Sequence, residues 1–551
     1  MGASALGLDG LISSRIVVAV TTICLTSFVY RLIKIRLMFY RLRQKGLPTP
    51  AWNPALGNLA VMAQLQKQGP RDTREAESFA LLSTEAPGCE AGFYVDVWPF
   101  SIPMLVVTSP ALAVQACQTY DLPKPDILQS FINPMAGGSD NLFVSNGAHW
   151  KQARDLFNHG FSMTAAISHI PYILEEAQVF VQMLKNHAQK GDIFSLDVLT
   201  CRYVMDIIGN VALNTRFQFQ EQHNPIAAAM RDTIELECGI ETYNFLNRWN
   251  PRRLYRQWQN GRTMDYLIGI ELDKRYKEWR ETAKSTSDLR SQSIMDLVIA
   301  EYMKTRPQTQ QQQQELDPAF KRWATIQIRL FLFVGHDSEA TTIIYSLYLL
   351  SKNPKVLIKV RAEHDRVFGA GVSSAYHVLK DYPEKINQLT YTHAVIKETL
   401  RLFPPANGLR GGLPGVSLRD EEGRLFPTEG CAIWIVHTAV HRNPSSWPQP
   451  HSFIPDRWLV EPGHPLYPPA GGWRPFEQGP RNCIGQNISL LGIKTSLAML
   501  VRQFDFHDAY AEYDRLHPST GLKTMFGERA YMIQKGAGHP AQGFPCKVTL
   551  R

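Results

Sequence analysis

The sequence predicts a large, mostly α-helical protein of the α+β class, attached to a membrane by one N-terminal transmembrane helix. The attachment is predicted by a long apolar stretch at residues 11–30. The helical class is predicted by helical periodicity, which dominates the chain from about residue 148 to residue 400. Beyond residue 400 the sequence changes to short strands, prolines and turns, and a last helical stretch follows residue 484.

No internal repeat and no second linker appear in the sequence, so we divide its 551 residues into three parts. These are a membrane anchor with a basic cytosolic flank at 1–45, a proline-rich hinge at 46–58 and one large domain at 59–551. Hydrophobic residues make up 44% and charged residues 20% of the chain, which is ordinary for a globular protein. This composition excludes a disordered chain and a polytopic membrane protein.

The positive charge of the chain is concentrated near its N-terminus. The whole sequence carries a net charge of +8, and residues 1–45 contain seven basic residues against one acidic residue, Asp9. Most of the net charge therefore belongs to the anchor region, and the rest of the chain is nearly neutral. A nucleic-acid-binding protein would spread positive charge over a folded face, so we expect no nucleic-acid partner.

The apolar stretch from Leu11 to Tyr30 contains one charged residue, Arg15. As a helix, a stretch of this length would cover a hydrocarbon core of roughly 30 Å. Six basic residues and no acidic ones follow at 31–45, and such an excess usually remains cytosolic. We therefore expect a short lumenal N-terminus and a cytosolic body. The alternatives are an amphipathic surface helix or a cleaved signal peptide, although a signal peptide carries its charge before the apolar stretch.

The hinge contains Pro48, Pro50 and Pro54 between Gly46 and Gly57. Prolines at this density stop a helix and stiffen the chain as it leaves the membrane. The hinge is therefore predicted to fix how the cytosolic body sits over the membrane surface.

Local signals predict several elements of the domain. Residues 93–107 predict two strands around a proline-marked turn, and residues 110–120 predict a helix. A further helix is predicted between Asn353, as its N-cap, and Gly369, as its stop. The polar, low-complexity segment at 306–318 predicts a mobile surface loop.

The eight cysteines form no zinc-binding or CxxC pattern, because the closest two, Cys89 and Cys117, are 28 positions apart. A cytosolic body of this size needs no disulfides, so we expect buried small hydrophobic residues at most of these positions. Cys483 differs from the others because glycines at 479 and 485 permit a tight loop around it.

The apolar run that begins at Ile484 has helical spacing, which places Cys483 at the N-terminus of a helix. Amide donors and the helix dipole there favour a thiolate over a thiol. A thiolate held in this way is a nucleophile or a metal ligand, and the segment contains no histidine to act as a base for a nucleophile. As the axial ligand of haem iron it would favour O–O cleavage. Phe476 would then shield the sulfur from water, and Arg481 would suit a haem propionate.

The segment Phe476–Gly485 reads FEQGPRNCIG and matches F-x-x-G-x-R-x-C-x-G at every fixed position. It therefore resembles the signature of the cytochrome P-450 superfamily. The resemblance implies the cytochrome P-450 fold, a large helical domain with small β-sheets, and haem b (iron protoporphyrin IX) with Cys483 as its axial thiolate ligand. Three further motifs follow the order that this family uses.

The first motif is Glu398-Thr-Leu-Arg401. The ExxR spacing also occurs elsewhere in this chain, but here LFPP follows it. In the family this pair is buried and binds an arginine from a later loop, which corresponds to Arg457. The resemblance implies that Glu398, Arg401 and Arg457 brace the haem-binding core and take no part in the chemical step.

The second motif is Gly335-His-Asp337-Ser338 within an apolar helix. Glycine inside a helix costs about 1 kcal/mol relative to alanine, so we expect a packing or functional reason for Gly335. In the family an acid followed by threonine relays protons to bound oxygen, which would assign this role to Asp337 and Ser338. Serine keeps the hydroxyl but lacks the β-methyl group that restricts the rotamer. The alternative is that Asp337 only satisfies local backbone groups.

The third motif is Trp150 and Arg154, spaced i,i+4. The family places such a pair against a haem propionate, and it often places another propionate partner at the position of Arg410.

The resemblance implies a haem-thiolate monooxygenase of the microsomal type. Such an enzyme activates O2 with electrons from NADPH through a separate NADPH–cytochrome reductase, and it lies on the cytosolic face of the endoplasmic reticulum membrane as a single-pass protein. The substrate would be an apolar small molecule. The chain ending GAGHPAQGFPCKVTL resembles fungal enzymes of secondary metabolism, including some that oxidise polyketides.

By analogy, the substrate pocket would be walled by four segments of the chain. These are the loop around 121–147, the helix face with Phe333 and Ser338, residues 405–409 and residues 523–526. Oxidative coupling, ring rearrangement and isomerisation of a peroxide remain alternatives to oxygen insertion. A haem-binding or electron-transfer protein is the alternative outside enzymes.

Overall fold

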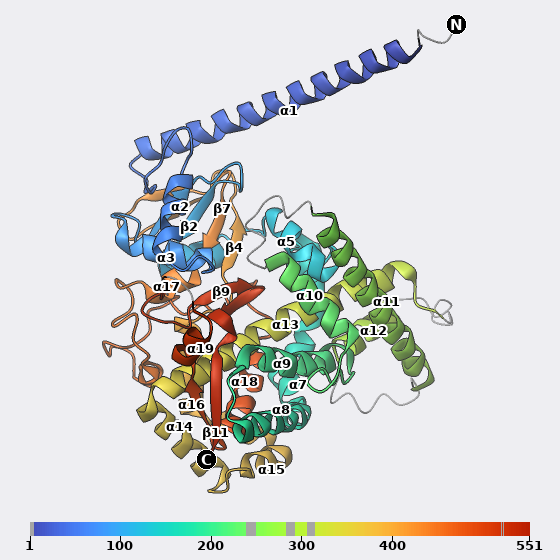
Figure 1. The fold of residues 1–551 in the computed structure, drawn as a ribbon, viewed down its shortest axis with the longest axis vertical. Coiled ribbons are helices and arrows are strands. Elements are labelled where there is room, and N and C mark those ends of the chain that lie inside the picture. Colours follow the sequence, from blue (N-terminus) through green and yellow to red (C-terminus); the bar gives the residue numbers. More distant parts are fainter. Residues whose placement is uncertain (1–4, 239–249, 283–292, 306–314, 519–520, 522) are drawn as a thin grey trace.

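The computed structural model of the protein describes residues 5–238, 250–282, 293–305, 315–518, 521 and 523–551 (Figure 1). A long helix, α1 (Ala5–Gln44), projects from a body whose described residues form many helices and four small sheets. The predicted fold class, mostly α within the α+β class with one N-terminal apolar helix, is confirmed. The predicted surface loop at 306–318 lies largely outside the described residues.

The remaining elements follow in chain order. The helices are α2 (Leu59–Gln68), α3 (Glu75–Glu85), α4 (Pro110–Val114), α5 (Ile127–Ala136), α6 (Gly147–Asn158), α7 (Met163–Ser168), α8 (Ile170–Lys190), α9 (Leu196–Leu213), α10 (Pro225–Cys238), α11 (Pro251–Thr282), α12 (Ile294–Thr305), α13 (Pro318–Lys352), α14 (Pro354–Phe368), α15 (Ser374–Asp381), α16 (Thr390–Leu402), α17 (His437–Arg442), α18 (Gln486–Leu500) and α19 (Tyr510–Leu516). The strands are β1 (Gly92–Val95), β2 (Met104–Val107), β3 (Phe194–Ser195), β4 (Gly408–Gly411), β5 (Ser417–Arg419), β6 (Leu425–Pro427), β7 (Ala432–Ile435), β8 (Phe504–Asp508), β9 (Met532–Lys535), β10 (Ala537–Pro540) and β11 (Pro545–Leu550).

Helix α1 contains the predicted membrane span and continues through the basic flank without a break. From Ile16 onward it is long and apolar enough to cross a membrane; its most apolar 18 residues have a mean hydropathy of 2.0, and none of them is buried in the body. The exposed apolar side chains of α1 are therefore the part of the described chain best suited to a lipid environment.

The C-terminal end of α1 packs against the body. Phe39 is fully buried and Leu42 is 6% exposed, and the Phe39 ring stacks on Trp52 of the hinge at a centroid distance of 6.5 Å. Arg36 forms an ion pair with the buried carboxylate of Asp96 and donates to the carbonyl of Pro54 at 2.9 Å. This end of α1 is therefore fixed to the first sheet and does not act as a loose flank.

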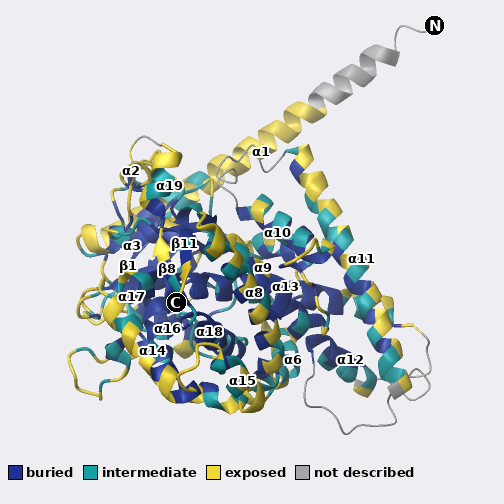
Figure 2. Ribbon diagram, turned by 60° about the horizontal axis from the view of Figure 1, so that its bottom comes forward, coloured by how far each residue is buried: buried dark blue, intermediate teal, exposed yellow. Residues whose placement is uncertain are grey.

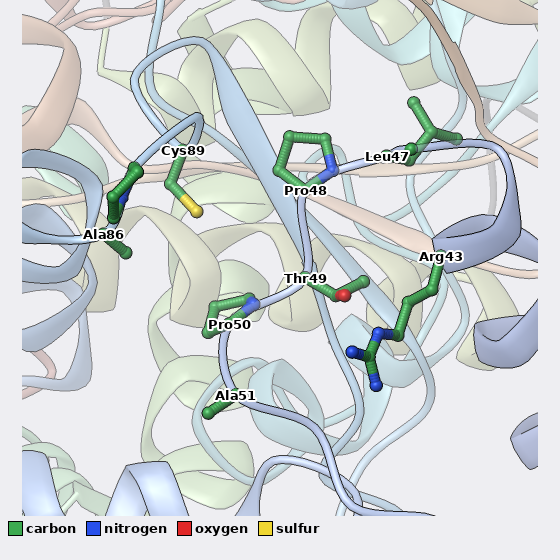
Figure 3. Close-up of a pocket in the computed structure, with 10 residues that line it drawn as sticks. Arg43, Leu47, Pro48, Thr49, Pro50, Ala51, Ala86 and Cys89 are labelled. Atoms are coloured by element: carbon green, nitrogen blue, oxygen red, sulfur yellow. The ribbon is translucent and has the colours of Figure 1, made fainter.

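The hinge runs along the same sheet and is held by backbone hydrogen bonds. The Tyr94 amide donates to the Pro48 carbonyl at 2.9 Å, and the Asn58 side chain donates to the Pro50 carbonyl at 2.8 Å. An open hollow lies beside the hinge, bordered by Arg43 and Cys89 among others (Figure 3). None of the predicted site residues lines this hollow.

The largest sheet among the described residues has the strand order β1-β2-β7-β4. The predicted pair of strands at 93–107 is confirmed, since β1 and β2 run antiparallel with Phe93 opposite Val106. Strand β7 joins β2 in parallel and β4 in antiparallel fashion, and β4 carries Arg410 opposite Ile433. The sheet therefore brings a residue from beyond position 400 beside the hinge and the end of α1.

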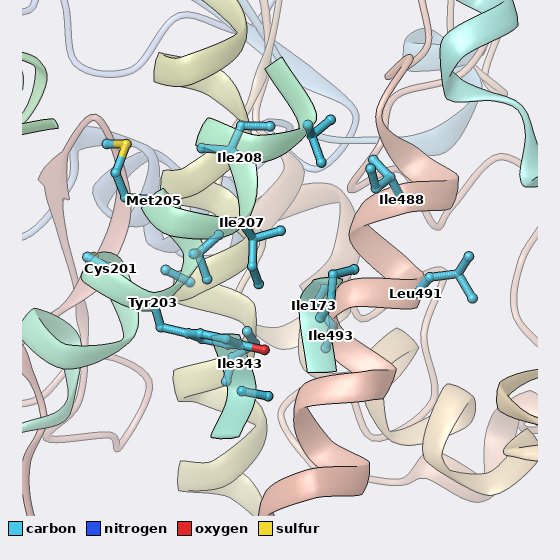
Figure 4. Close-up of a cluster of buried hydrophobic side chains, with 14 of the residues drawn as sticks. Ile173, Cys201, Tyr203, Met205, Ile207, Ile208, Ile343, Ile488, Leu491 and Ile493 are labelled. Atoms are coloured by element: carbon cyan, nitrogen blue, oxygen red, sulfur yellow. The ribbon is translucent and has the colours of Figure 1, made fainter. Parts of the chain in front are cut away.

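Helix α13 is the central element of the body. All its residues from Ala324 to Leu350 are buried except Val334, Gly335 and Ser338. Figure 2 shows buried residues gathered along α9, α13 and α18, and Figure 4 shows apolar side chains of α8, α9, α13 and α18 packed between these helices. A Cβ at Gly335 would lie 2.5 Å from Ile208 Cδ1 of α9, so this glycine allows α9 and α13 to approach closely.

Two further predicted helices are present, with differences at their ends. The helix at 110–120 is α4 followed by a π-helical turn at Gln115–Thr119. The helix α14 ends at Gly369, whose φ is +81° as expected for a helix stop. Asn353 occupies the predicted N-cap position and Pro354 begins α14, but the Asn353 side chain donates to the Leu349 carbonyl at the end of α13 instead of capping α14.

A truncation tests the contribution of the end of α1. Deletion of residues 1–34 should weaken membrane association and change the thermal unfolding midpoint little, because it removes the partly exposed Phe28, whose ring contacts Trp98, but keeps the docked end of the helix. Deletion of residues 1–45 should lower the midpoint by several degrees, since Phe39 and Leu42 each contribute about 1.5–3 kcal/mol of burial and Asp96 loses its cation. Equal midpoints for the two truncations in detergent would contradict the docking role.

Candidate functional site

Cys483 lies in a tight loop directly before α18. The Cys483 amide donates to the Phe476 carbonyl at 2.7 Å and closes the loop, and the Phe476 ring packs on Trp473 at a centroid distance of 5.9 Å. Gly479 has a φ of +89°, and a Cβ there would lie 2.2 Å from the Cys117 carbonyl oxygen. The loop therefore depends on glycine both for its backbone conformation and for its contact with the chain around Cys117.

Cys483 is exposed to solvent, although protein atoms surround its sulfur. Cys483 and Cys24 of α1 are the exposed cysteines, and the other six are buried. Burial nevertheless raises the pKa of the Cys483 thiol, whereas the Gly485 amide and the Arg154 guanidinium act in the opposite direction. With no ligand at the sulfur, loss of hydration therefore outweighs these two donors. A cation bound at the sulfur would supply the missing stabilisation.

Between Ala324 and Leu350, helix α13 is buried except at Val334, Gly335 and Ser338. We call these three residues the accessible face of α13. The Ser338 hydroxyl donates to the Val334 carbonyl at 3.3 Å, so the side chain is held along the helix. Helix α18 lies close to α13, since a Cβ at Gly492 would lie 2.1 Å from Glu339 Oε1. The loop before α18 and the accessible face of α13 therefore belong to one region.

Three cations gather beside the cysteine loop with too few anions to match them. Arg410 is fully buried, and its Nε and Nη2 atoms have no hydrogen-bond partner among the described residues. The Nη1 atom of Arg481 also lacks a partner within these residues. Burial, and then the charge of Arg410, lower the pKa of Lys124 to about 7. Buried donors without acceptors indicate a site for an anionic ligand.

Helix α6 holds the cysteine loop from one side. Arg154 donates to the backbone carbonyl and to the side-chain oxygen of Asn482, both at 2.7 Å. The guanidinium of Arg481 lies over the Trp150 ring, 4.4 Å from its centroid, and donates to the Ser145 carbonyl at 2.9 Å. Trp150 and Arg154 therefore meet the loop at two adjacent residues, and Arg154 acts on its backbone.

The residues Glu398, Arg401 and Arg457 meet in the interior, and all three are fully buried. Glu398 Oε1 accepts from Arg401 at 2.8 Å and from Arg457 at 3.0 Å, and its Oε2 accepts from Trp458 Nε1 at 3.0 Å. The amide of Ile454 donates to the same carboxylate at 3.0 Å. One carboxylate thus fixes α16 to the loop that follows α17.

His441 connects this carboxylate network to the cysteine loop. Its Nδ1 lies 3.2 Å from the Arg401 carbonyl, and its Nε2 accepts from the Arg474 amide at 2.9 Å. Burial lowers the pKa of His441 well below its ordinary value, so the ring is neutral, as one accepting nitrogen requires. Arg474 in turn binds Glu477, six positions before Cys483.

Asp337 and Ser338 are not hydrogen-bonded to each other in this structure. The buried carboxylate of Asp337 accepts from His539 Nε2 at 2.8 Å and from the Ala537 amide. His539 Nδ1 lies 2.6 Å from Asp197 Oδ1. The acid is thus turned toward β10, and its partners are far away in the sequence rather than the local backbone groups of the alternative reading.

Sequence reasoning missed several residues of this region: Lys124, Asp197, His441, Trp458 and His539. A weak signal existed for His539, because it lies in the C-terminal segment GAGHPAQG that resembled other fungal enzymes. Nothing in the spacing of that segment could pair the histidine with an acid 202 positions earlier.

A sequence model of the cytochrome P-450 family matches residues 84–531 of the chain. The chain belongs to the cytochrome P-450 family. The matched range includes every predicted site residue. As a member of this family the cytochrome P-450 is an oxidoreductase of the monooxygenase type, and the family's chemistry uses haem, a cysteine thiolate and O2.

Three fungal relatives resemble this cytochrome P-450 over most of its length. The cytochrome P-450 monooxygenase polC of Polytolypa hystricis is 36% identical over 547 residues, which cover 98% of this chain and 96% of polC. The cytochrome P-450 monooxygenase acrF of Aspergillus aculeatus is 32% identical over 83% of this chain and 94% of acrF. The cytochrome P-450 monooxygenase ptmG of Penicillium ochrochloron is 27% identical over 94% of this chain and 92% of ptmG.

Replacement of Glu398 by Gln should destabilise this cytochrome P-450 by about 3–5 kcal/mol, because two buried guanidinium groups lose their charge partner. Urea or thermal unfolding measures the loss. The matched control is Glu421→Gln, which changes an exposed member of another ExxR segment and should have an effect below about 0.5 kcal/mol. Equal stability of the two variants would contradict the bracing role.

Lys124 predicts a pH dependence of haem retention. Burial and the charge of Arg410 lower its pKa to about 7 even though Glu477 acts in the opposite direction, so the amine is largely neutral above that value. Bound propionates would raise this pKa, so haem binding would take up a proton and weaken as the pH rises above about 7. Transfer of haem to a scavenging protein should accelerate accordingly in the wild type. In the Lys124→Met variant the rate of haem transfer should not increase above about pH 7 for this reason, whereas the control Lys151→Met, at an exposed position, should behave like the wild type.

Proposed function

We propose that this cytochrome P-450 inserts one oxygen atom from O2 into an apolar small molecule and receives its electrons from NADPH through a separate reductase. Haem, when bound, would supply the activation of O2. The observation that carries the proposal is that the exposed Cys483 occurs together with arginine N–H groups that lack acceptors among the described residues and with the accessible face of α13.

The residues present fit a haem group. Cys483 would be the axial thiolate ligand, with Phe476 shielding the sulfur. The propionates would neutralise Arg410 and Arg481, whose free N–H groups require acceptors, and Lys124 would provide a third cation. Trp150 and Arg154 would hold the loop in place, and Glu398, Arg401 and Arg457 would brace the core behind it.

Ser338 and Asp337 of α13 would deliver protons at the proposed haem site. The Ser338 hydroxyl is partly exposed there and would hold a proton or a water molecule next to the haem. Asp337 would supply the proton after its side chain leaves His539 and rotates toward Ser338. Gly335 leaves this face without a side chain and also sets the approach of α9.

The substrate pocket is proposed between the segment at 121–147, which includes α5, the face of α13 with Phe333 and Ser338, residues 405–409 and residues 523–526. Contacts between α5 and α13 support this arrangement, as does the Gly538 amide, which donates to the Pro405 carbonyl at 2.8 Å beside β10. The fungal relatives and the C-terminal segment support a secondary metabolite, such as a polyketide-derived compound, as the substrate.

We place the enzyme on the endoplasmic reticulum as a single-pass protein with its body in the cytosol. Helix α1 supports the span, and Arg41 and Arg43 near its end support the orientation.

Two measurements test this function. The reduced, CO-bound protein should show the Soret band of a thiolate ligand, and Cys483→Ala should lose it while the control Cys24→Ala keeps it. Turnover with reductase, NADPH and O2 labelled with heavy oxygen should place one labelled atom in the product of a polyketide-derived substrate.

A second function is favoured by one observation, the separation of Asp337 from Ser338. An isomerase acting on a peroxide does not need the pair. Product formed without NADPH, and with no labelled atom from O2, would establish that function and contradict oxygen insertion.

A further inference from the structure

Three elements far apart in the sequence meet at His539. Its two ring nitrogens contact Asp197 in the first turn of α9, at 2.6 Å, and Asp337 of α13, at 2.8 Å. All three side chains are buried, at 2%, 3% and 6% exposure for His539, Asp197 and Asp337. Because both nitrogens face carboxylate oxygens, the ring donates at both and carries a positive charge.

The hairpin that carries His539 is shaped around Asp337. Strands β9 and β10 pair antiparallel with Ala537 opposite Lys535, so Gly536 alone forms the turn. Gly536 has a φ of +84°, and a Cβ there would lie 2.4 Å from Asp337 Oδ2. The Ala537 amide donates to the same oxygen. A larger residue at the turn would push the hairpin away from the acid.

The charges around His539 balance without a further ion. Burial would lower the pKa of His539, but Asp197 and Asp337 raise it to about 10, and Asp197 and Asp337 are themselves held below their ordinary pKa despite their burial. Arg231 of α10 supplies a second positive charge nearby. Other titratable groups also face this cluster: Cys201 of α9, His336 of α13, Cys238 and Glu235 of α10, Lys535 of β9 and Tyr510 of α19.

A metal ion is a poorer occupant of this cluster. Asp197, Cys201 and His539 have ligand atoms within 4.8 Å of one another. However, both nitrogens of His539 are already used by carboxylates. Burial, and then the charge of Asp197, also raise the pKa of Cys201 well above its ordinary value, which disfavours the thiolate that a metal requires.

We propose that His539 is a positioning residue for Asp337. Clamped between Asp197 and Asp337, it holds the acid toward β10 and away from Ser338. Proton delivery at the accessible face of α13 then requires Asp337 to leave His539. This inference rests on the proposed function, because it assigns a starting position to the acid of that function.

The clamp also links the acid to the proposed substrate pocket. Gly538, next to His539, donates to the Pro405 carbonyl at 2.8 Å, and residues 405–409 are a proposed pocket wall. A substrate that displaces this wall would move the hairpin and loosen the contact between His539 and Asp337. Release of the acid would then follow binding of the substrate.

The test uses the full-length holoenzyme and three variants. His539→Gln removes the charge, His539→Lys retains a charge, and His507→Gln changes an exposed histidine of strand β8, which belongs to another sheet, as the control. The first readout is the thermal unfolding midpoint as a function of pH, which needs no turnover. The second is the pH profile of NADPH consumption with added reductase.

The expected sign of the thermal effect follows from the raised pKa of His539. Its stabilisation is fully present below about pH 6.5, the unfolded value, and is lost as the pH rises through about 10. The difference in midpoint between wild type and His539→Gln should therefore be large at pH 6 and shrink toward pH 10. The His507→Gln control should follow the wild type at every pH. A constant difference would overturn the clamp.

The kinetic effect separates positioning from a structural role. Without a cation beside it, the buried carboxyl of Asp337 should hold its proton to a higher pH, so the profile for His539→Gln should move upward by about one pH unit or more. The His539→Lys variant should restore the wild-type profile. An unmoved profile in His539→Gln, with a normal CO-bound Soret band, would overturn the inference. If the wild type itself lacks the CO-bound Soret band, the proposed function is wrong, and so is the link between His539 and proton delivery. The pH dependence of the thermal unfolding midpoint still tests whether His539 holds Asp337.

If His539→Gln does not fold, the Asp197→Asn variant replaces it, because Asp197 contacts the other ring nitrogen of His539. It removes one of the two anions that hold the imidazolium, so the thermal difference should again shrink at high pH. The kinetic profile should move upward by less than in His539→Gln, because the ring still contacts Asp337. No change in either readout would overturn the inference.

Discussion

The carboxylate of Glu398 is the contact on which the cysteine side of this cytochrome P-450 depends. It accepts hydrogen bonds from Arg401, Arg457, Trp458 and the Ile454 amide in a fully buried position. Arg401 then binds three backbone carbonyls of the following loops, at His441, Pro450 and Ser452. Through His441 and Arg474 the same network reaches the loop of Cys483. The loop of Cys483 is thus connected to a carboxylate that lies in the interior of the protein.

The polar groups of the proposed haem site differ in how far their hydrogen-bonding capacity is satisfied. Behind the Cys483 loop, the network of Glu398, Arg401 and His441 is hydrogen-bonded through to the Arg474 amide, so this support is in place before any cofactor binds. Beside it, Arg410 and Arg481 keep buried N–H groups without acceptors among the described residues. Such groups are costly in isolation and become favourable once an anion arrives. The free energy of cofactor binding therefore includes relief of a cost already present in the protein.

Spacing alone predicted the contacts that are local in the chain, whereas the longer contact between Glu398 and Arg457 was predicted only through the family resemblance. Glu398 and Arg401 are three positions apart on one helix, and the turn from Phe476 to Cys483 closes on itself, so their spacing carries the geometry. The fold class and the first two strands followed from periodicity in the same way. The partner of Asp337 could not be predicted, because His539 reaches it through a hairpin formed 202 positions later. Likewise, neither the raised pKa of Cys483 nor the lowered pKa of Lys124 can be read from spacing, because both depend on burial.

Helix α1 passes from its apolar part into the body without a joint, and its last turns are locked by Phe39, Leu42 and the ion pair of Arg36. The helix is consequently attached rigidly to the body and is not joined to it by a flexible linker. Any tilt that a bilayer imposes on the helix is passed to the first sheet, so bilayer thickness would set the angle at which the body meets the lipid surface. An exchange of anchors between related enzymes would preserve that angle only if the graft keeps the helical phase leading into Arg36.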